Sequence, residues 1–174
     1  YYMLNKPQGV VSATEDNREK TVLDCIALKK RKDLFPVGRL DKDTEGLLLI
    51  TNDGALAHRL LSPKKHVDKT YFVRLRENLS QEDSRKLCEG VDIGEENLTM
   101  PADITGFVPG DRQCCITIRE GKFHQVKRMF ASVGNEVVYL KRLSMGPLIL
   151  DEGLKPGQYR KLSAEEIERL KNNA

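Results

Sequence analysis

The amino-acid sequence predicts an α+β fold with a mixed, mostly antiparallel sheet and flanking helices. Two observations lead to this prediction. Segments with strand-like and helix-like patterns follow one another irregularly, without the regular spacing of βαβ units. The chain has 174 residues, of which 39% are apolar, which suits one domain or two lobes that share a core. We therefore expect residues 1–174 to act as one domain.

Alternation of apolar and polar residues marks the expected strands. In the segment 70–74 and the residue after it, Tyr71, Val73 and Leu75 fall on one face, which predicts that this face is buried. Four further segments carry strand-like runs of the same kind. The five expected strands are residues 2–4, 46–51, 70–74, 113–119 and 136–140.

Helices are indicated by residues that can cap their first turn. A short polar side chain accepts a hydrogen bond from the free backbone N–H groups there, and an acidic residue three positions later completes a capping box. Glycine at residue 90 is expected to end the second of these helices. The three N-terminal signals are Asp53, Ser80 with Asp83, and Ser163 with Glu166.

A helix over residues 124–133 is the best defined of all. Its apolar residues fall within one arc at about 100° per residue, and its cationic residues fall opposite. Gly134 is a suitable stop. One face should therefore pack in the core while the other forms a cationic patch. The apolar arc holds Val126, Met129, Phe130 and Val133, and the cationic arc holds His124, Lys127 and Arg128.

Composition narrows the class of protein. No segment approaches the roughly 18 uninterrupted apolar residues of a membrane span, so we expect no membrane association. The four cysteines form no CxxC pair and no cluster with zinc-site spacing. Adjacent Cys114 and Cys115 would face opposite sides of a strand. Free thiols in a reducing, cytoplasmic setting fit this pattern.

Charge distribution is more informative than the net charge of +3. Several basic clusters are separated along the chain, and together they suit a polyanionic partner. A single basic cluster of this kind would indicate only a solvent-exposed surface. The clusters are Lys29-Lys30-Arg31-Lys32, Lys64-Lys65, residues 122–128 and Lys141-Arg142.

The segment from Gly38 to Gly46 (GRLDKDTEG) stands directly before an apolar strand. This places Asp41 on a turn or strand end, where a fold can present a carboxylate to a ligand. Arg39 lies two residues away, so on extended chain both side chains point the same way. An arginine there would keep the carboxylate ionised and fix its orientation. The competing interpretation is a surface turn with a local ion pair.

Three kinds of chemistry could use this segment. A calcium loop is disfavoured because its last ligand position falls on Asn52 instead of a bidentate Glu. A phosphoryl-transfer aspartate fits Asp41-Lys42-Asp43-Thr44, which resembles the DxDxT box of haloacid-dehalogenase-type phosphatases. That chemistry needs Mg²⁺ and a hydrophobic strand entering the first Asp, and residues 35–40 make a poor one. A lone aspartate acting on nucleic acid needs cations and a stacking aromatic, both of which the chain supplies.

Four separated motifs resemble, in order, those of bacterial pseudouridine synthases, most closely the RsuA type that modifies 16S ribosomal RNA. The resemblance covers essentially the whole chain. It implies the pseudouridine synthase fold with a central active-site cleft, and an isomerase that needs neither cofactor nor metal. The motifs are Lys6-Pro7-Gln8-Gly9, the run from Gly38 to Gly54, Lys69-Thr70-Tyr71, and the segment from Glu120 to Met129.

The resemblance also implies roles for single residues. Asp41 matches the essential aspartate, and Arg39 the arginine that pairs with it in the free enzyme and helps flip the nucleotide. Tyr71 matches the tyrosine that stacks on the target uracil. Lys127 matches the basic residue that forms an ion pair with the aspartate. Val126, next to it, matches the apolar wall of the pocket. Lys6 and Pro7 match a motif that buttresses the tyrosine. Lys6, Lys122, His124, Gln125 and Arg128 are further expected to contact RNA.

RsuA-type proteins usually carry a small S4-like RNA-binding domain ahead of the catalytic part. The sequence opens within a strand-like segment, so we expect that domain upstream and absent from this chain. The expected partner is ribosomal RNA or a ribosome assembly intermediate, and the expected state is a monomer. The chemical course stays open between attack of the carboxylate at C1′, its addition to the ring, and removal of the 2′ proton.

Two alternative functions stay open at this stage. Enzymes of the RluB, RluE and RluF branch share all four motifs and act on 23S ribosomal RNA. An inactive RNA-binding module would keep the basic clusters without the chemistry. Tyr71 could also be an ordinary core aromatic, and His124 could cap its helix.

Overall fold

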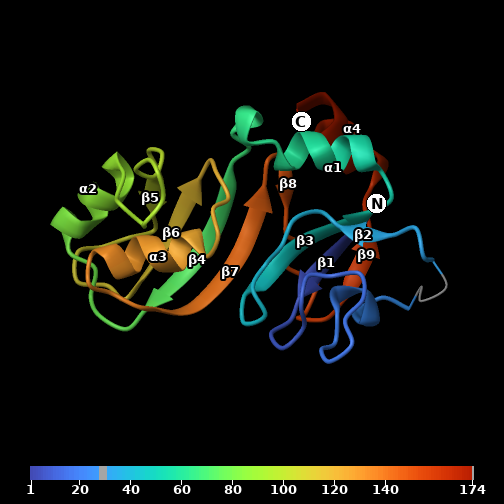
Figure 1. Cartoon of the computed structure of the whole chain (residues 1–174), viewed down its shortest axis with the longest axis horizontal. Helices are drawn as coiled ribbons and strands as arrows, with labels where there is room; N and C mark the ends of the chain where they lie inside the picture. Colours follow the sequence, from blue (N-terminus) through green and yellow to red (C-terminus); the bar gives the residue numbers. More distant parts are fainter. Residues whose placement is uncertain (28–30, 174) are drawn as a thin grey trace. The chain divides into compact units, whose positions relative to one another are not determined.

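The computed structural model describes residues 1–27 and 31–173, which divide into two compact units. The first unit comprises Tyr1–Val67 with Arg142–Ala174, and the second comprises Asp68–Lys141. Strand β7 (Val137–Met145) spans this division, since its residues through Lys141 belong to the second unit and those from Arg142 to the first. Figure 1 shows the elements along the chain.

Strand β1 (Tyr2–Lys6) is central to the sheet of the first unit. It pairs antiparallel with β3 (Glu45–Thr51) on one side and β9 (Tyr159–Lys161) on the other. The register sets Tyr2 against Ile50 and Lys6 against Gly46. Two short strands extend this sheet, with β2 (Phe35–Pro36) on β3 and β8 (Leu148–Ile149) on β7. Every residue of β1 is buried, so this strand forms the middle of the unit.

Two helices pack on this sheet, α1 (Gly54–Leu61) and α4 (Ala164–Asn173) (Figure 1). Both begin as the sequence predicts. The Asp53 carboxylate accepts from Leu56 N at 3.0 Å, while Ser163 and Glu166 bond each other's backbone N–H groups at 2.9 and 3.1 Å. Two 3₁₀ turns, η1 (Val22–Cys25) and η2 (Pro63–Lys65), complete the unit. Its core cluster includes Met3, Leu47, Leu49, Leu56, Leu60, Met145, Leu148 and Leu170.

The second unit is built on β4 (Lys69–Leu75), which pairs antiparallel with β6 (Gln113–Ile118). Strand β5 (Asp103–Thr105) pairs antiparallel with β6 on its other side. The predicted buried face of β4 is confirmed, because Tyr71, Val73 and Leu75 are at most 9% exposed. Helix α2 (Gln81–Glu89) begins at the expected Ser80 cap and ends at Gly90. Helix α3 (Gln125–Ser132) is the predicted amphipathic helix.

The predicted fold class is confirmed. The strand pairings named above are antiparallel, and an isolated parallel bridge joins Val11 to Thr21. All five expected strands are present, although the last extends to Met145. The sequence did not indicate β2, β5, β8 and β9, which have two or three residues each. In the part of the chain that is described, no helix has the length and apolarity to cross a bilayer.

Candidate active site

Asp41 opens a tight turn that leads into β3. The backbone N–H of Thr44 donates to the carbonyl oxygen of Asp41 at 3.0 Å, which closes the turn. Asp41 is half-buried, whereas Lys42 and Asp43 at the tip are exposed. The predicted position of this carboxylate, on a turn before a buried strand, is therefore confirmed.

Lys6 lies buried beneath this turn. Its Nζ donates to the carbonyl oxygens of Lys42 at 3.2 Å, Thr44 at 2.8 Å and Pro7 at 3.0 Å. The backbone N–H of Gly9 also donates to the carbonyl of Lys42, at 2.9 Å. The side chain of Lys6 is 0% exposed, so the predicted RNA contact for it is wrong. Its ammonium group instead holds the backbone on which Asp41 is presented.

Burial makes the stability of this support depend on pH. It lowers the pKa of Lys6 from 10.5 to about 8, despite the opposing attraction of Asp43, Asp41 and Glu45. Between these two values the unfolded chain binds more protons than the folded one, so stability rises with pH across this window. We predict that the free energy of unfolding of the parent, minus that of Lys6→Met, increases by about 1–3 kcal/mol over that range. Urea unfolding of both proteins at a series of pH values measures this difference. If the free energies of unfolding of the parent and of Lys6→Met changed with pH in the same way, the prediction would be contradicted.

Ser12 is a supporting residue that sequence reasoning missed. Its hydroxyl accepts from Leu40 N at 3.0 Å and donates to Leu40 O at 2.9 Å, so it clamps the residue between Arg39 and Asp41. Leu40 is buried, while Arg39 is exposed and Asp41 half-buried, as expected for neighbours that alternate on extended chain. The expected pairing of Arg39 with Asp41 stays a prediction.

The second unit carries the other expected site residues. Tyr71 lies early in β4, opposite Ile116, and is 9% exposed. Val126, in the first turn of α3, is buried, which suits an apolar wall. Lys127 follows it on the half-buried face, and Lys122 and His124 are exposed. These positions agree with the expected apolar and cationic faces of the helix.

Gln125 departs from its expected role. Its side chain is buried, and its Oε1 accepts from Lys122 N at 3.0 Å while its Nε2 donates to Glu120 Oε1 at 2.8 Å. The same Glu120 oxygen accepts from Met100 N at 2.9 Å. The amide is therefore occupied inside the unit, and the predicted direct RNA contact by Gln125 is corrected to a structural one. It fixes the turn over residues 120–125.

Arg128 is engaged within the second unit. Its Nη1 donates to Phe123 O at 2.8 Å and to Glu95 Oε1 at 3.0 Å, and its Nη2 donates to the carbonyl of Ile93. This guanidinium thus ties the turn before α3 to the segment around residue 94. Its expected contact with RNA stays a prediction. Of the basic cluster at residues 29–32, Lys29 and Lys30 lie outside the described residues, and Arg31 pairs with Asp33 at 2.9 Å.

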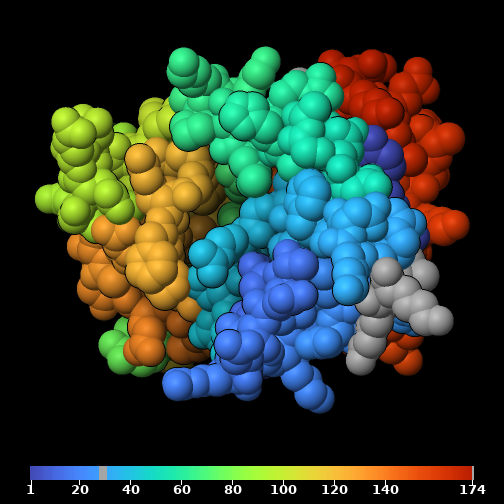
Figure 2. Space-filling model, turned by 45° about the vertical axis from the view of Figure 1, so that its right-hand side comes forward, coloured from blue at the N-terminus to red at the C-terminus, as the bar shows by residue number. Residues whose placement is uncertain are grey.

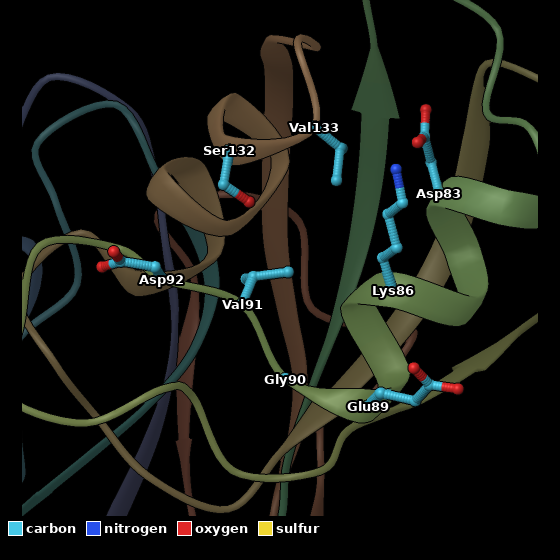
Figure 3. A pocket seen from close by; sticks show the side chains of 8 residues that line it. All are labelled: Asp83, Lys86, Glu89, Gly90, Val91, Asp92, Ser132 and Val133. Carbon is cyan, nitrogen blue, oxygen red and sulfur yellow. The ribbon is translucent and has the colours of Figure 1, made fainter.

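An open hollow of about 510 Å³ lies beside α2 and the end of α3, within the second unit (Figure 3). None of the expected site residues lines it. Its lining mixes acids, a lysine and backbone, and in Figure 3 the Lys86 side chain extends from α2 between Asp83 and Val133. The lining residues are Asp83, Lys86, Glu89, Gly90, Val91, Asp92, Ser132 and Val133.

The cysteines are free thiols, as expected. Burial raises the pKa of Cys114 to about 12, so this thiol is unreactive at neutral pH. Cys114 is buried and Cys115 half-buried, in line with opposite faces of β6. Across the residues that are described, no group of three His, Cys, Asp or Glu side chains is placed to hold a metal ion.

Comparison with known proteins gives consistent matches along the chain. The model of the RNA pseudouridylate synthase family matches residues 1–132. An uncharacterized RNA pseudouridine synthase, YtzG of Bacillus subtilis (strain 168), is 57% identical over 173 residues, covering 98% of this chain and 72% of that protein. Ribosomal small subunit pseudouridine synthase A of Escherichia coli (strain K12) is 46% identical over 168 residues, covering 96% and 72%. A crystal structure of a pseudouridylate synthase superposes with a TM-score of 0.91 at 43% identity, covering 97% and 72%.

Proposed function

Because this chain belongs to the RNA pseudouridylate synthase family, we propose that it converts a specific uridine of small-subunit ribosomal RNA to pseudouridine. The observation that carries the proposal is the 46% identity, over nearly the whole chain, to a synthase named for the ribosomal small subunit. The turn that presents Asp41 on its buried Lys6 support is in keeping with the proposal, since such a reaction needs a carboxylate.

The reaction breaks the N1–C1′ bond of uridine, turns the base and forms a C5–C1′ bond, while the proton on C5 is replaced by one on N1. Substrate and product are isomers, so no group is transferred to or from another molecule. We propose Asp41 as the catalytic carboxylate and Arg39 and Lys127 as the cations that act with it on the RNA. Leu40 and Val126, both buried, would limit access of water.

The base must leave the helical stack before it can react, which costs a few kcal/mol in paired RNA. We propose that Tyr71 recovers about 1–3 kcal/mol of this by stacking on the uracil. Lys122 and His124, both exposed, are proposed to contact the phosphate backbone. The proposed partner is ribosomal RNA within an assembly intermediate in the cytoplasm, and the protein is proposed to act there as a monomer.

A direct experiment tests the function. The chain is incubated with 16S or 23S ribosomal RNA transcribed in vitro and, separately, with ribosomal assembly particles of both subunits from a strain that lacks the gene. Pseudouridines are then mapped by carbodiimide modification and primer extension. One new pseudouridine at one position is expected. Product confined to 23S RNA, or no product on either form of substrate, would contradict the proposal.

The role of Tyr71 predicts the outcome of Tyr71→Phe. Stacking needs the ring and not the hydroxyl, so this variant should keep turnover within about tenfold of the parent. Release of tritium from uridine labelled at C5 measures the rate. Tyr71→Ala, which removes the ring, is the matched control and should lose far more. Equal loss in both variants would instead assign the phenol oxygen to proton transfer.

A further inference from the structure

The turn between β6 and α3 exposes an aromatic pair. The rings of Phe123 and His124 are stacked, with centroids 3.8 Å apart and planes inclined by 17°. Phe123 is 73% exposed, the largest fraction among the exposed large apolar residues of the described chain. His124 covers part of one ring face, and most of the remaining surface of Phe123 is open to solvent. The segment around residues 120–128, gold in Figure 2, lies on the surface of the face drawn there.

This turn is held rigidly from inside the unit. Its backbone is fixed by the buried amide of Gln125, by Gln125 N donating to Lys122 O at 3.1 Å, and by Arg128 Nη1 donating to Phe123 O at 2.8 Å. The aromatic pair is therefore presented by a stiff turn and not by a loose loop. Little conformational entropy would be lost when a ligand settles on it.

Presenting the pair costs the protein free energy. His124 adopts a left-handed backbone conformation, with φ of 47° and ψ of 38°, which a side chain other than glycine seldom takes. An exposed phenylalanine also forgoes the burial that favours folding. Strain and exposure in one turn suit a binding role, because neither contributes to the core.

The charge around the pair favours an anionic ligand. The segment 121–128 (GKFHQVKR) contains three Lys or Arg residues and no Asp or Glu. Lys69 also approaches the turn, since its Nζ lies 3.4 Å from where a Cβ on Gly121 would be.

Two acids next to the turn are engaged inside the unit: Glu120 Oε1 accepts from Gln125 and Met100, and Glu95 Oε1 accepts from Arg128 Nη1 at 3.0 Å. The charge of Arg128 is therefore offset by Glu95, and Lys122 and Lys69 are the cations that favour an anionic ligand. An aromatic face set among cations is the combination that binds single-stranded nucleic acid, in which bases stack and phosphates are neutralised.

We propose that Phe123, backed by His124, is a stacking platform for an unpaired nucleobase of the RNA. This base is a second one, distinct from the uridine that reacts. The inference rests on the proposed function, because it adds a second contact to the RNA that is the proposed substrate. Lys122 would meet the phosphate next to the stacked base. Because every base has an aromatic face, the platform would hold the strand with little preference for sequence.

The chain contains no tryptophan, which permits a direct test. Phe123→Trp places a single indole on the platform, and stacking of a base quenches indole fluorescence. The probes are a short single-stranded oligouridylate and an oligonucleotide of equal length with the same phosphodiester backbone but abasic sugars. We expect strong quenching by the first and little by the second.

Val108→Trp is the matched control. Val108 is 64% exposed and precedes the start of β6, whereas the platform follows the end of this strand. Its fluorescence should not respond to either probe. The proposed platform would be contradicted if oligouridylate and abasic strand quenched Phe123→Trp equally. It would also be contradicted if the tryptophans at positions 123 and 108 were quenched equally.

Affinity provides a second readout. Phe123→Ala and Phe123→Leu should each bind oligouridylate about 5- to 150-fold more weakly, the range of base–aromatic stacking, with abasic strand affinity unchanged. Leucine keeps an apolar side chain, so retained affinity in Phe123→Leu would overturn the proposal in favour of a plain apolar contact, as with a protein partner. If the parent forms no pseudouridine but Phe123→Trp is quenched by bases, the proposed function fails and the platform stands. An active parent without such quenching gives the opposite result.

Discussion

Replacing Asp41 by Asn is expected to abolish pseudouridine formation, with turnover reduced by at least about a thousandfold. The substitution keeps the size of the side chain and removes only its charge and basicity. Without these, the side chain can neither attack the sugar or base nor remove a proton. Tritium release under single-turnover conditions measures the chemical step, separate from release of product.

The fold should tolerate this change, because the turn is held through its backbone. Thr44 donates to the main-chain oxygen of Asp41, and Lys6 donates to main-chain oxygens of Lys42 and Thr44. Replacing the carboxylate removes none of these bonds. Thermal unfolding and the affinity for RNA should therefore stay close to those of the parent.

Asp43→Asn provides the matched control for this experiment. Asp43 is an exposed acid of the same turn, two residues further on, and no catalytic role is proposed for it. We expect this variant to retain most of the parent's activity. If Asp43→Asn lost as much activity as Asp41→Asn, or if Asp41→Asn turned over above about one part in a thousand, Asp41 would not be the catalytic group.

Features set by neighbouring residues could be predicted from the sequence. The caps at Asp53, Ser80 and Ser163 form within one helical turn, so a few consecutive residues determine them. The two faces of α3 follow from its own periodicity. The short strands β2, β5, β8 and β9 could not be found in this way. Two or three residues carry no measurable alternation, and pairing with a distant partner defines them.

The errors at the candidate site share a physical cause. Lys6 and Gln125, polar residues of two of the four motifs, were expected to contact RNA. Both are buried instead, and each bonds to groups that the sequence pattern does not reveal, namely the main-chain oxygens of Lys42 and Thr44 for Lys6 and the carboxylate of Glu120 for Gln125. A partial signal did exist for Lys6, because it ends a largely apolar strand. Ser12 gave none, since its contact with Leu40 spans 28 residues of sequence.

A substitution at Gly46 is also expected to have a large effect. Gly46 is the first buried residue of β3 after the Asp41 turn. Its φ is +110°, and a Cβ added there would lie 2.2 Å from the main-chain oxygen of Arg142 and 2.6 Å from its nitrogen. Both atoms belong to the backbone of β7, which cannot yield as the end of a flexible side chain can. Arg142 is itself buried, with Nε donating to Leu47 O at 2.9 Å. Gly46 is thus needed both for its conformation and for close approach of the two strands.

Gly46→Ala should therefore destabilise the protein by more than about 4 kcal/mol, or prevent folding, because strain and a backbone clash act together. Gly54→Ala is the matched control: Gly54 is the first residue of α1, its φ is not positive, and an added Cβ would meet nothing within 4 Å. That variant should be neutral or up to about 1 kcal/mol more stable than the parent, since alanine favours helix and restricts the unfolded chain. Urea unfolding followed by circular dichroism compares the two. Because β3 directly continues the turn that carries Asp41, any Gly46→Ala protein that does fold should also lose activity. A variant that is both stable and active would show that β3 and β7 do not need this close approach.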